Sequence, residues 1–344
     1  MIQENAKNCK RLSTIIFISV FRNILAYFLV KFFKIYPDIY QILPKNMPKS
    51  ENKKDGRKAL AKKLFLQELH KICKIGLLED DSHNDITSDL TIKNNSEISF
   101  KITAREELIL CGVDVINFCF DELIKFPKFK KSSLALQINA KNGDLIKPQG
   151  LIAQGFGDAK LIFAAERIIL NLLQHLSGIS TLTNKFVKTL NNKKIKILDT
   201  RKTFPGARTL QKYAVATGGG SNHRFNLSDA ILIKDNHIAA AGSVTKALEL
   251  AKKFKKLKIE IECDNLKQVS EAVKQKPHII MLDNMKISDI QKAIKLINKK
   301  SQIEISGGIT LESIKKFSKL DVDFISIGAL THSVKAVDIG LDVE

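Results

Sequence analysis

The second half of this 344-residue chain alternates between short apolar runs and amphipathic segments, and this alternation most limits the fold it can adopt. The predicted strands are 195–198, 230–233, 258–262, 278–282, 302–305 and 324–327. The predicted helices are 208–217, 243–255, 266–275, 288–298 and 311–319, with N-caps expected at Ser243, Asn265, Ser288 and Thr310. Strands joined by single helices in a right-handed sense form a parallel sheet. We therefore predict an α/β part long enough to curl into a barrel.

Basic side chains follow the first two of these strands directly. Arg201 and Lys202 come after the first strand and Lys234 after the second. Between them a helical segment ends at three glycines and leads to His223 and Arg224. In a (β/α) barrel the carboxyl ends of the strands form the active-site rim. If the strands are parallel neighbours, these five side chains converge there and form a site for a multiply charged anion.

Acidic and glycine-rich segments follow the later strands. Glu262 and Asp283 stand at the ends of two of them, where a buried carboxylate is costly unless it meets a metal, a hydroxyl or a cation. Glycines allow backbone N–H groups to approach a phosphate. We predict that the rim binds a sugar phosphate together with Mg²⁺, beside a small di-acid held by the basic residues. The predicted phosphate loops contain Ser306, Gly307, Gly308 and Gly328.

Two other functions fit part of this pattern. A Schiff-base lyase would use Lys234 or Lys202 as its nucleophile, because a lysine among other cations has a lowered pKa. That chemistry does not explain why so many further cations are gathered. A binding protein without catalysis is the other alternative, and paired carboxylates opposite a cation cluster argue against it.

Residues 59–190 are predicted to form an α+β domain, followed by the α/β barrel domain at 191–344. A helix is expected over 60–77 with Gly76 as its cap, and strands over 98–104, 134–140 and 151–156, mainly antiparallel. The run 164–176 predicts a strong helix, with Ser177-Gly178 leading into another helix that ends near residue 190. Spacing alone gives Arg167 a solvated position on the first of these helices.

Residues 1–58 are predicted to be a basic extension and linker. The net charge of +20 suggests nucleic-acid binding, but residues 1–64 hold fourteen Lys or Arg against four acids, half of the excess. The rest has no aromatic platform, so we expect no nucleic-acid partner. The apolar runs before residue 31 are too short to span a membrane. Surface membrane contact by residues 1–46 is the less favoured alternative to a natural start at Met47. Five scattered cysteines suggest a reducing compartment, and we expect a cytoplasmic protein.

A set of motifs in the same order resembles the quinolinate phosphoribosyltransferase family, also called nicotinate-nucleotide pyrophosphorylase (carboxylating). The resemblance covers about residues 64–344. The motifs are NDIT (84–87), AERIILNLLQHLSGI (165–179), LDTRKTFPG (198–206), KYAV-x-x-GGG-x-NHR (212–224), LIKDNHI (232–238), IMLDNM (280–285), EISGGIT (304–310) and SIGALTHS (326–333). It implies a type II phosphoribosyltransferase with an α+β N-terminal domain and an open (β/α) barrel-like C-terminal domain. The implied reaction joins quinolinate and phosphoribosyl pyrophosphate and yields nicotinate mononucleotide, pyrophosphate and CO₂ for NAD biosynthesis.

The resemblance also assigns roles to individual residues. Glu262 and Asp283 match acids at the ribose hydroxyls and Mg²⁺, with Glu260 ranked below Glu262. Arg167 matches an arginine that enters the neighbouring subunit's site, which implies a homodimer or a higher homo-oligomer. The quinolinate carboxylates would be held by Arg201, Lys202, His223, Arg224 and Lys234, and phosphate by Ser306, Gly307, Gly308 and Gly328. Lys202, Glu262 and Asp283 are the candidate catalytic residues.

Two positions depart from the family pattern. Phe204 stands where many members have a polar residue, and Ala207 where Leu is common. Neither is a charged ligand, so the predicted site is intact. A relative encoded among molybdenum-transport genes stays open as an alternative, although the complete set of carboxylate-binding residues argues against it.

Overall fold

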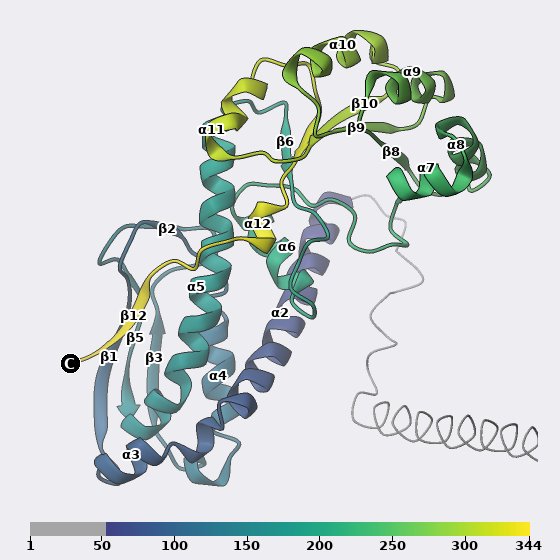
Figure 1. Ribbon diagram of the computed structural model, residues 1–344. Helices are drawn as coiled ribbons and strands as arrows, with labels where there is room; N and C mark the ends of the chain where they lie inside the picture. Colours follow the sequence, from purple (N-terminus) through teal and green to yellow (C-terminus); the bar gives the residue numbers. More distant parts are fainter. Residues whose placement is uncertain (1–52) are drawn as a thin grey trace, which may run out of the picture. The chain divides into compact units, whose positions relative to one another are not determined.

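The computed structural model describes residues 53–344, in which Arg57–Glu344 forms one compact unit. It contains a four-stranded antiparallel sheet, a six-stranded parallel sheet and a short two-stranded ladder (Figure 1). The predicted combination of an α+β part and an open α/β barrel is confirmed. The boundaries at 58/59 and 190/191 stay predictions. The expectations for residues 1–46, including the start at Met47, lie outside the described residues.

The antiparallel sheet has the order β12(Ile339–Val343), β1(Glu97–Ala104), β5(Leu151–Asp158), β3(Leu134–Ile138). The short ladder pairs β2(Leu108–Ile109) with β4(Leu145–Ile146). Helices α3(Ile86–Thr91) and α4(Val115–Leu123) and two 3₁₀ turns, Ser82–Asn84 and Pro127–Phe129, complete this part. The sequence did not indicate that β12, at the end of the chain, returns to pair with β1, with Ile102 opposite Leu341.

Helix α2(Lys53–Glu79) continues through Gly76, which was wrongly predicted to be its cap. A Cβ at Gly76 would lie 3.1 Å from the Ile168 side chain, so the glycine allows close packing of two helices. The ring of Phe65 stacks on Tyr213 with centroids 3.8 Å apart. This contact ties α2 to α6(Arg208–Thr217).

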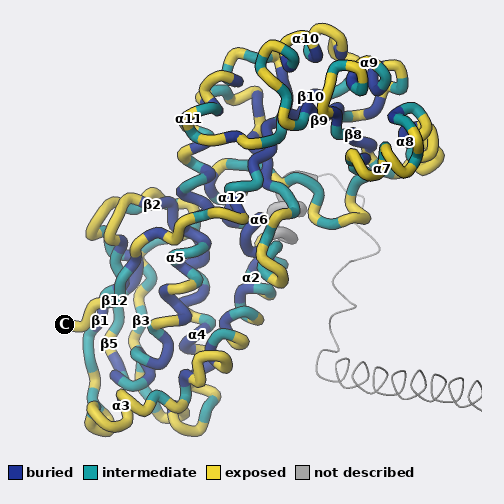
Figure 2. The backbone as a smooth tube through the Cα atoms, viewed as in Figure 1, coloured by how far each residue is buried: buried dark blue, intermediate teal, exposed yellow. Residues whose placement is uncertain are grey.

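Helix α5(Ala159–Leu190) is continuous for 32 residues, so the predicted break at Ser177-Gly178 is wrong. The two residues serve packing instead of ending the helix. The Ser177 hydroxyl accepts the Cys111 N–H at 3.0 Å, and a Cβ at Gly178 would overlap the Lys335 carbonyl. Figure 2 shows α5 as largely buried, and it contacts both β12 and α11(Leu311–Ile314).

The parallel sheet has the order β6(Lys196–Leu198), β11(Phe324–Ser326), β10(Gln302–Ser306), β9(Ile279–Asp283), β8(Ile259–Cys263), β7(Ile231–Ile233). All six predicted strands are present, with ends that differ by at most one residue. β6 and β7 are the edges of this sheet. Ser221 extends it beyond β6 through a parallel bridge to Leu198. In the described residues the barrel therefore stays open between this segment and β7.

The helices of this part are α6, α7(Asp235–Ala241), α8(Val244–Lys252), α9(Leu266–Gln275), α10(Ile287–Ile297), α11 and α12(Ala329–His332). The short helices α7 and α12 were not predicted, and the predicted helix 311–319 divides into α11 and a 3₁₀ turn, Lys315–Phe317. The Ser243, Asn265 and Thr310 side chains cap their helices as predicted. Ser288 does not, because partly buried Ile287 already begins α10 after Lys286. None of the helices described here is long and apolar enough to cross a membrane.

Candidate active site

The ends of the parallel strands bring together most of the predicted site residues. Lys234 directly follows Ile233, which lies opposite Ile261, so it stands beside Glu262. Glu262 is opposite Met281, and Asp283 is opposite Ser306. Since side chains alternate along a strand, Glu262, Met281 and Asp283 point to one face of the sheet. The rim therefore carries a cation, two acids and a glycine loop in neighbouring positions.

The Asp199 carboxylate holds the turn before Phe225 through several hydrogen bonds. It is fully buried and accepts hydrogen bonds from Asn222 Nδ2 at 2.6 Å and the His223 backbone N–H at 2.9 Å. The Lys212 ammonium, from buried α6, pairs with Asp199 and also donates to the His223 carbonyl at 3.0 Å. This network connects the end of β6 with α6 and the turn. It fixes the backbone from which His223 and Arg224 project.

Burial works against the charges of this pair. Desolvation raises the pKa of Asp199, and the Lys212 charge and hydrogen bonds oppose it. Desolvation likewise lowers the pKa of Lys212, and the Asp199 charge opposes it. Each charge is tolerated in this interior only because the other is present. Loss of either partner should therefore disturb the turn.

Arg201 and Arg224 lie close enough to repel each other. Burial, followed by the Arg201 charge, lowers the pKa of Arg224. Arg224 Nη1 donates to the Ala230 carbonyl at 3.1 Å and so bridges the open edge of the barrel to β7. Arg201 Nε is buried without a hydrogen-bond partner among the described residues. Two neighbouring guanidinium groups and an unpaired donor form a place where an anion would relieve repulsion.

Inside the barrel His223 meets two acids. His223 Nε2 is 3.1 Å from Glu260 Oε2 and 3.6 Å from Glu304 Oε1. Its Nδ1 accepts the Arg224 backbone N–H at 2.7 Å. Burial, then the Glu260 charge, raises the pKa of Glu304 to about 8. Both ring nitrogens of His223 thus have protein partners, and its direct contact with quinolinate stays a prediction.

The two predicted rim acids differ in their partners. Lys234 Nζ lies 2.5 Å from Glu262 Oε2, and Asn284 Nδ2 donates to Asp283 Oδ2 at 2.6 Å. The second oxygen of each carboxylate receives no hydrogen bond from the part of the chain that the structure describes. An ammonium that donates to a carboxylate is not free to act as an amine nucleophile. This argues against Lys234 as the lysine of a Schiff-base lyase.

The predicted phosphate loops are shaped by glycine. Gly307 has φ 96° and Gly308 has φ 58°. A Cβ at Gly307 would overlap the Asn284 side chain, whereas a Cβ at Gly308 would have no described atom within 4 Å. A Cβ at Gly328 would lie 3.3 Å from Lys202 Cδ, so Lys202 borders the loop of the last strand. Its carbonyl accepts the Thr331 hydroxyl at 2.7 Å. Lys202 therefore lies beside Gly328.

Arg167 has no polar contact with the described rim residues of its own subunit. It is exposed on α5 and forms no hydrogen bond or ion pair with any residue of the described chain. Its predicted place in a partner's site stays a prediction.

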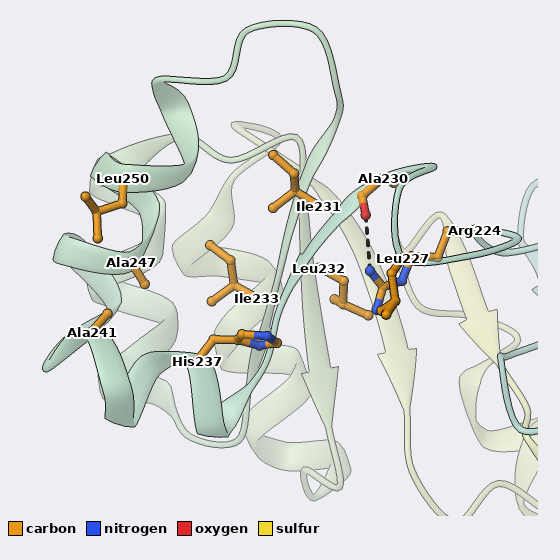
Figure 3. A pocket seen from close by; sticks show the side chains of 10 residues that line it. All are labelled: Arg224, Leu227, Ala230, Ile231, Leu232, Ile233, His237, Ala241, Ala247 and Leu250. Atoms are coloured by element: carbon orange, nitrogen blue, oxygen red, sulfur yellow. Dashed lines mark hydrogen bonds between the residues drawn. The ribbon is translucent and has the colours of Figure 1, made fainter. Parts of the chain in front are cut away.

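A hollow of about 380 Å³ opens on the other side of β7, against α7 and α8 (Figure 3). Most of its lining is apolar, and Arg224 and His237 are its basic residues. The rim acids do not line it. The hollow is therefore a neighbour of the site and shares Arg224 with it.

Sequence reasoning gave no role to Asp199, Lys212 or Glu304. Two signals could have found them. Lys212 is one of the buried residues of α6, together with Leu210 and Val215, and Glu304 takes an interior position of a buried strand. A charged residue at a buried position needs a partner of opposite charge or a hydrogen-bond donor. This requirement indicates that Lys212 and Glu304 contact other polar residues in the interior.

The fold and the rim define a class. A parallel, open α/β barrel that gathers guanidinium groups, ammonium groups, carboxylates and glycine loops at its strand ends has the arrangement of an enzyme acting on anionic, phosphorylated substrates.

Comparison with known proteins defines the family. The N-terminal domain of quinolinate phosphoribosyl transferase matches residues 85–177, and its C-terminal domain matches residues 179–342. A probable nicotinate-nucleotide pyrophosphorylase (carboxylating) from Methanocaldococcus jannaschii is 44% identical over 286 residues, covering 79% of this chain and 96% of the relative. One from Bacillus subtilis is 40% identical over 278 residues, covering 80% and 93%. The solved nicotinate-nucleotide pyrophosphorylase from Francisella tularensis superposes with a TM-score of 0.75 at 39% identity, covering 81% and 97%. This chain belongs to the quinolinate phosphoribosyltransferase family.

Proposed function

We propose that this protein transfers phosphoribose from phosphoribosyl pyrophosphate to the ring nitrogen of quinolinate. The products are nicotinate mononucleotide, pyrophosphate and CO₂, which makes the reaction a step of NAD biosynthesis. Family membership supports the reaction. The observation that carries the proposal is the pair of neighbouring guanidinium groups, Arg201 and Arg224, neither of which forms a close ion pair with a carboxylate of the described chain.

In this proposal the basic residues bind the two carboxylates of quinolinate. Arg201 and Arg224 form the centre, with Lys202 and Lys234 at the sides and His223 behind Arg224. A hydrogen bond to a charged group contributes about 1.5–3 kcal/mol, so two forked contacts suffice to select a di-acid over a mono-acid.

Glu262 and Asp283 would face the phosphoribose. Each leaves one carboxylate oxygen without a donor among the described residues, which fits a ribose hydroxyl or a hydrated Mg²⁺ ion. We therefore propose Mg²⁺ as the metal, held by these acids directly or through water. When bound, Mg²⁺ neutralises charge on the pyrophosphate leaving group. Ser306, Gly307, Gly308 and Gly328 would take the 5′-phosphate through their backbone N–H groups.

The charge that develops on the substrates accounts for the order in which bonds break and form. As the bond from C1 to pyrophosphate breaks, positive charge grows on the ribose, and Glu262 and Asp283 stabilise it. The quinolinate nitrogen attacks with its lone pair, so no general base is required. The adjacent carboxylate departs as CO₂ and leaves its electron pair on the ring carbon, where the positive charge of the neighbouring pyridinium nitrogen stabilises it. A proton then replaces that carboxylate on the ring carbon.

We further propose a homodimer or larger homo-oligomer in which Arg167 completes the partner's site. Arg167 is exposed and has no partner of its own in the described chain, which suits that role. We place the activity in the cytoplasm. The four described cysteines, Cys73, Cys111, Cys119 and Cys263, are free and buried, as expected of a reducing compartment.

The test is an assay of the full-length protein with phosphoribosyl pyrophosphate, Mg²⁺ and either quinolinate or nicotinate, following CO₂ and nucleotide. We expect turnover with quinolinate and none with nicotinate. Turnover with nicotinate alone would refute the substrate assignment. Turnover with neither would favour a divergent relative of the molybdenum-locus type.

A further inference from the structure

Glu304 is a buried carboxyl group to which the reaction gives no role. It lies on β10 with 0% of its surface exposed, and neither of its oxygens has a hydrogen-bond partner in the described part of the chain. Within the same described residues, Glu260 Oε1 on β8 has no hydrogen-bond donor either. An ionised carboxylate with no donor in such surroundings is too costly to persist. One proton on Glu304 would satisfy orphaned atoms on both acids.

The ring of His223 supplies the second observation. Its Nδ1 accepts the Arg224 backbone N–H, so the lone pair on that nitrogen is in use and the ring proton lies on Nε2. Nε2 faces Glu260 Oε2 at 3.1 Å and therefore donates to it. Glu260 is thus the group that orients the ring, and the ring is bonded to the Arg224 backbone.

We propose that Glu304 is a neutral carboxylic acid that donates its proton to Glu260 and thereby positions the His223–Arg224 turn. The hydrogen bonds would run from Glu304 to Glu260, from His223 to Glu260, and from the Arg224 N–H to His223. Glu304 is then a positioning residue for the quinolinate end of the site. The kinetic part of this inference rests on the proposed function, and its structural part does not.

The same three side chains could be taken for a metal site, since their ligand atoms lie within 4.8 Å of one another. The hydrogen bonding argues against this. A neutral imidazole that binds a metal through Nε2 must carry its proton on Nδ1, where the Arg224 N–H already donates. His223, Glu260 and Glu304 are therefore better described as a hydrogen-bonded network than as a metal site.

The groups around Glu304 determine how it responds to pH. His223 faces it from the turn, Glu260 from β8 and the Ser326 hydroxyl from β11. The charge of Lys212 acts on His223, and that of Arg224 acts on Glu260. Burial lowers the pKa of His223, but the hydrogen bond to Glu260 and the charges of Glu260 and Glu304 raise it overall. A neutral Glu304 removes one of the two charges that raise it. At alkaline pH loss of the Glu304 proton would place two carboxylates beside each other, and the bond to Glu260 would be lost.

Spectroscopy on the full-length protein tests the protonation states without substrate. In the infrared difference spectrum between the natural protein and Glu304→Gln at neutral pH, we expect the carbonyl band of a protonated acid. Nitrogen-15 NMR of labelled histidine, with His223 assigned through His223→Gln, should show a neutral ring with its proton on Nε2. A carboxylate band for Glu304, a doubly protonated ring or a proton on Nδ1 would each overturn the proposal.

Kinetics test the positioning role. Glu304→Leu removes the donor, and we expect the quinolinate KM to rise about tenfold while the KM for phosphoribosyl pyrophosphate changes less than about twofold. Glu304→Gln keeps an N–H donor toward Glu260, so its quinolinate KM should stay within about threefold of the natural value. Equal effects of the two variants, or equal effects on both substrates, would contradict the proposal. If the natural protein did not use quinolinate, the proposed function would fail while the spectroscopic result still decided the state of Glu304.

Discussion

At the scale of single residues, the buried pair Lys212–Asp199 holds the turn that carries His223 and Arg224. Lys212→Met keeps the length of the side chain and leaves Asp199 buried without its cation. We expect the free energy of unfolding to fall by about 3–5 kcal/mol, the usual cost of breaking a buried ion pair, and the quinolinate KM to rise. Urea denaturation and steady-state kinetics measure the two effects.

The exposed Lys196 on β6 provides the matched control for this change. Lys196→Met should alter stability by less than about 0.5 kcal/mol. If the two variants were equally stable, the Asp199 network would not hold the turn.

The stability of the protein should also depend on the Glu304 proton. Its pKa rises from 4.5 in an unfolded chain to about 8 when folded, so between these values the folded state holds a proton that the unfolded state has released. The stabilisation from this group is complete below about pH 4.5, declines by up to about 1.4 kcal/mol per pH unit, and is gone above about pH 8.

Comparison with Glu304→Gln isolates this dependence, because the amide does not titrate. As the pH rises to about 8, the unfolding free energy of the natural protein should fall relative to that of Glu304→Gln. Parallel pH profiles for both proteins would mean that Glu304 is ionised in the folded state.

At the scale of elements, the sequence predicted the parallel sheet well and the helix interruptions poorly. Each strand of the sheet is a short apolar run between polar ends, so local composition suffices to find it. The sequence predicts a helix cap at Gly76 and a break at Ser177-Gly178 because glycine is common at helix ends. These small residues are instead required by tertiary contacts with Ile168, Cys111 and Lys335, and the local sequence gives no information about such contacts.

Those contacts predict opposite outcomes for two helical glycines. Gly178→Ala would push a methyl group against the Lys335 backbone carbonyl, and the clash should outweigh the gain of about 1 kcal/mol in helix propensity. Gly76→Ala meets only the flexible Ile168 side chain, at 3.1 Å, and should be close to neutral. Thermal unfolding of both variants makes the comparison. Equal melting temperatures would show that the backbone at Lys335 yields as easily as a side chain.

At the scale of the whole molecule, two kinds of information were absent from the sequence pattern. The pairing of β12 with β1 joins residues more than 230 positions apart, and periodicity carries no information about such a pairing. The second is the contact of the buried acids with His223. Cations at strand ends stood out as clusters, whereas Glu260 and Glu304 alternate with isoleucines and look like ordinary strand residues. Only the three-dimensional structure places them against His223.

Assembly gives the last prediction. If Arg167 of one subunit completes the site of the next, then Arg167→Ala and Asp283→Ala damage a site from different subunits. Each variant alone should be almost inactive. When the two are unfolded together and refolded as dimers, half of the dimers are mixed, and each mixed dimer contains one site with both residues intact. The mixture should therefore recover about a quarter of the natural activity. Mixing without refolding, or refolding either variant alone, provides the control. If the co-refolded mixture stayed inactive while its mixed dimers were demonstrated by mass spectrometry, Arg167 would act within its own subunit.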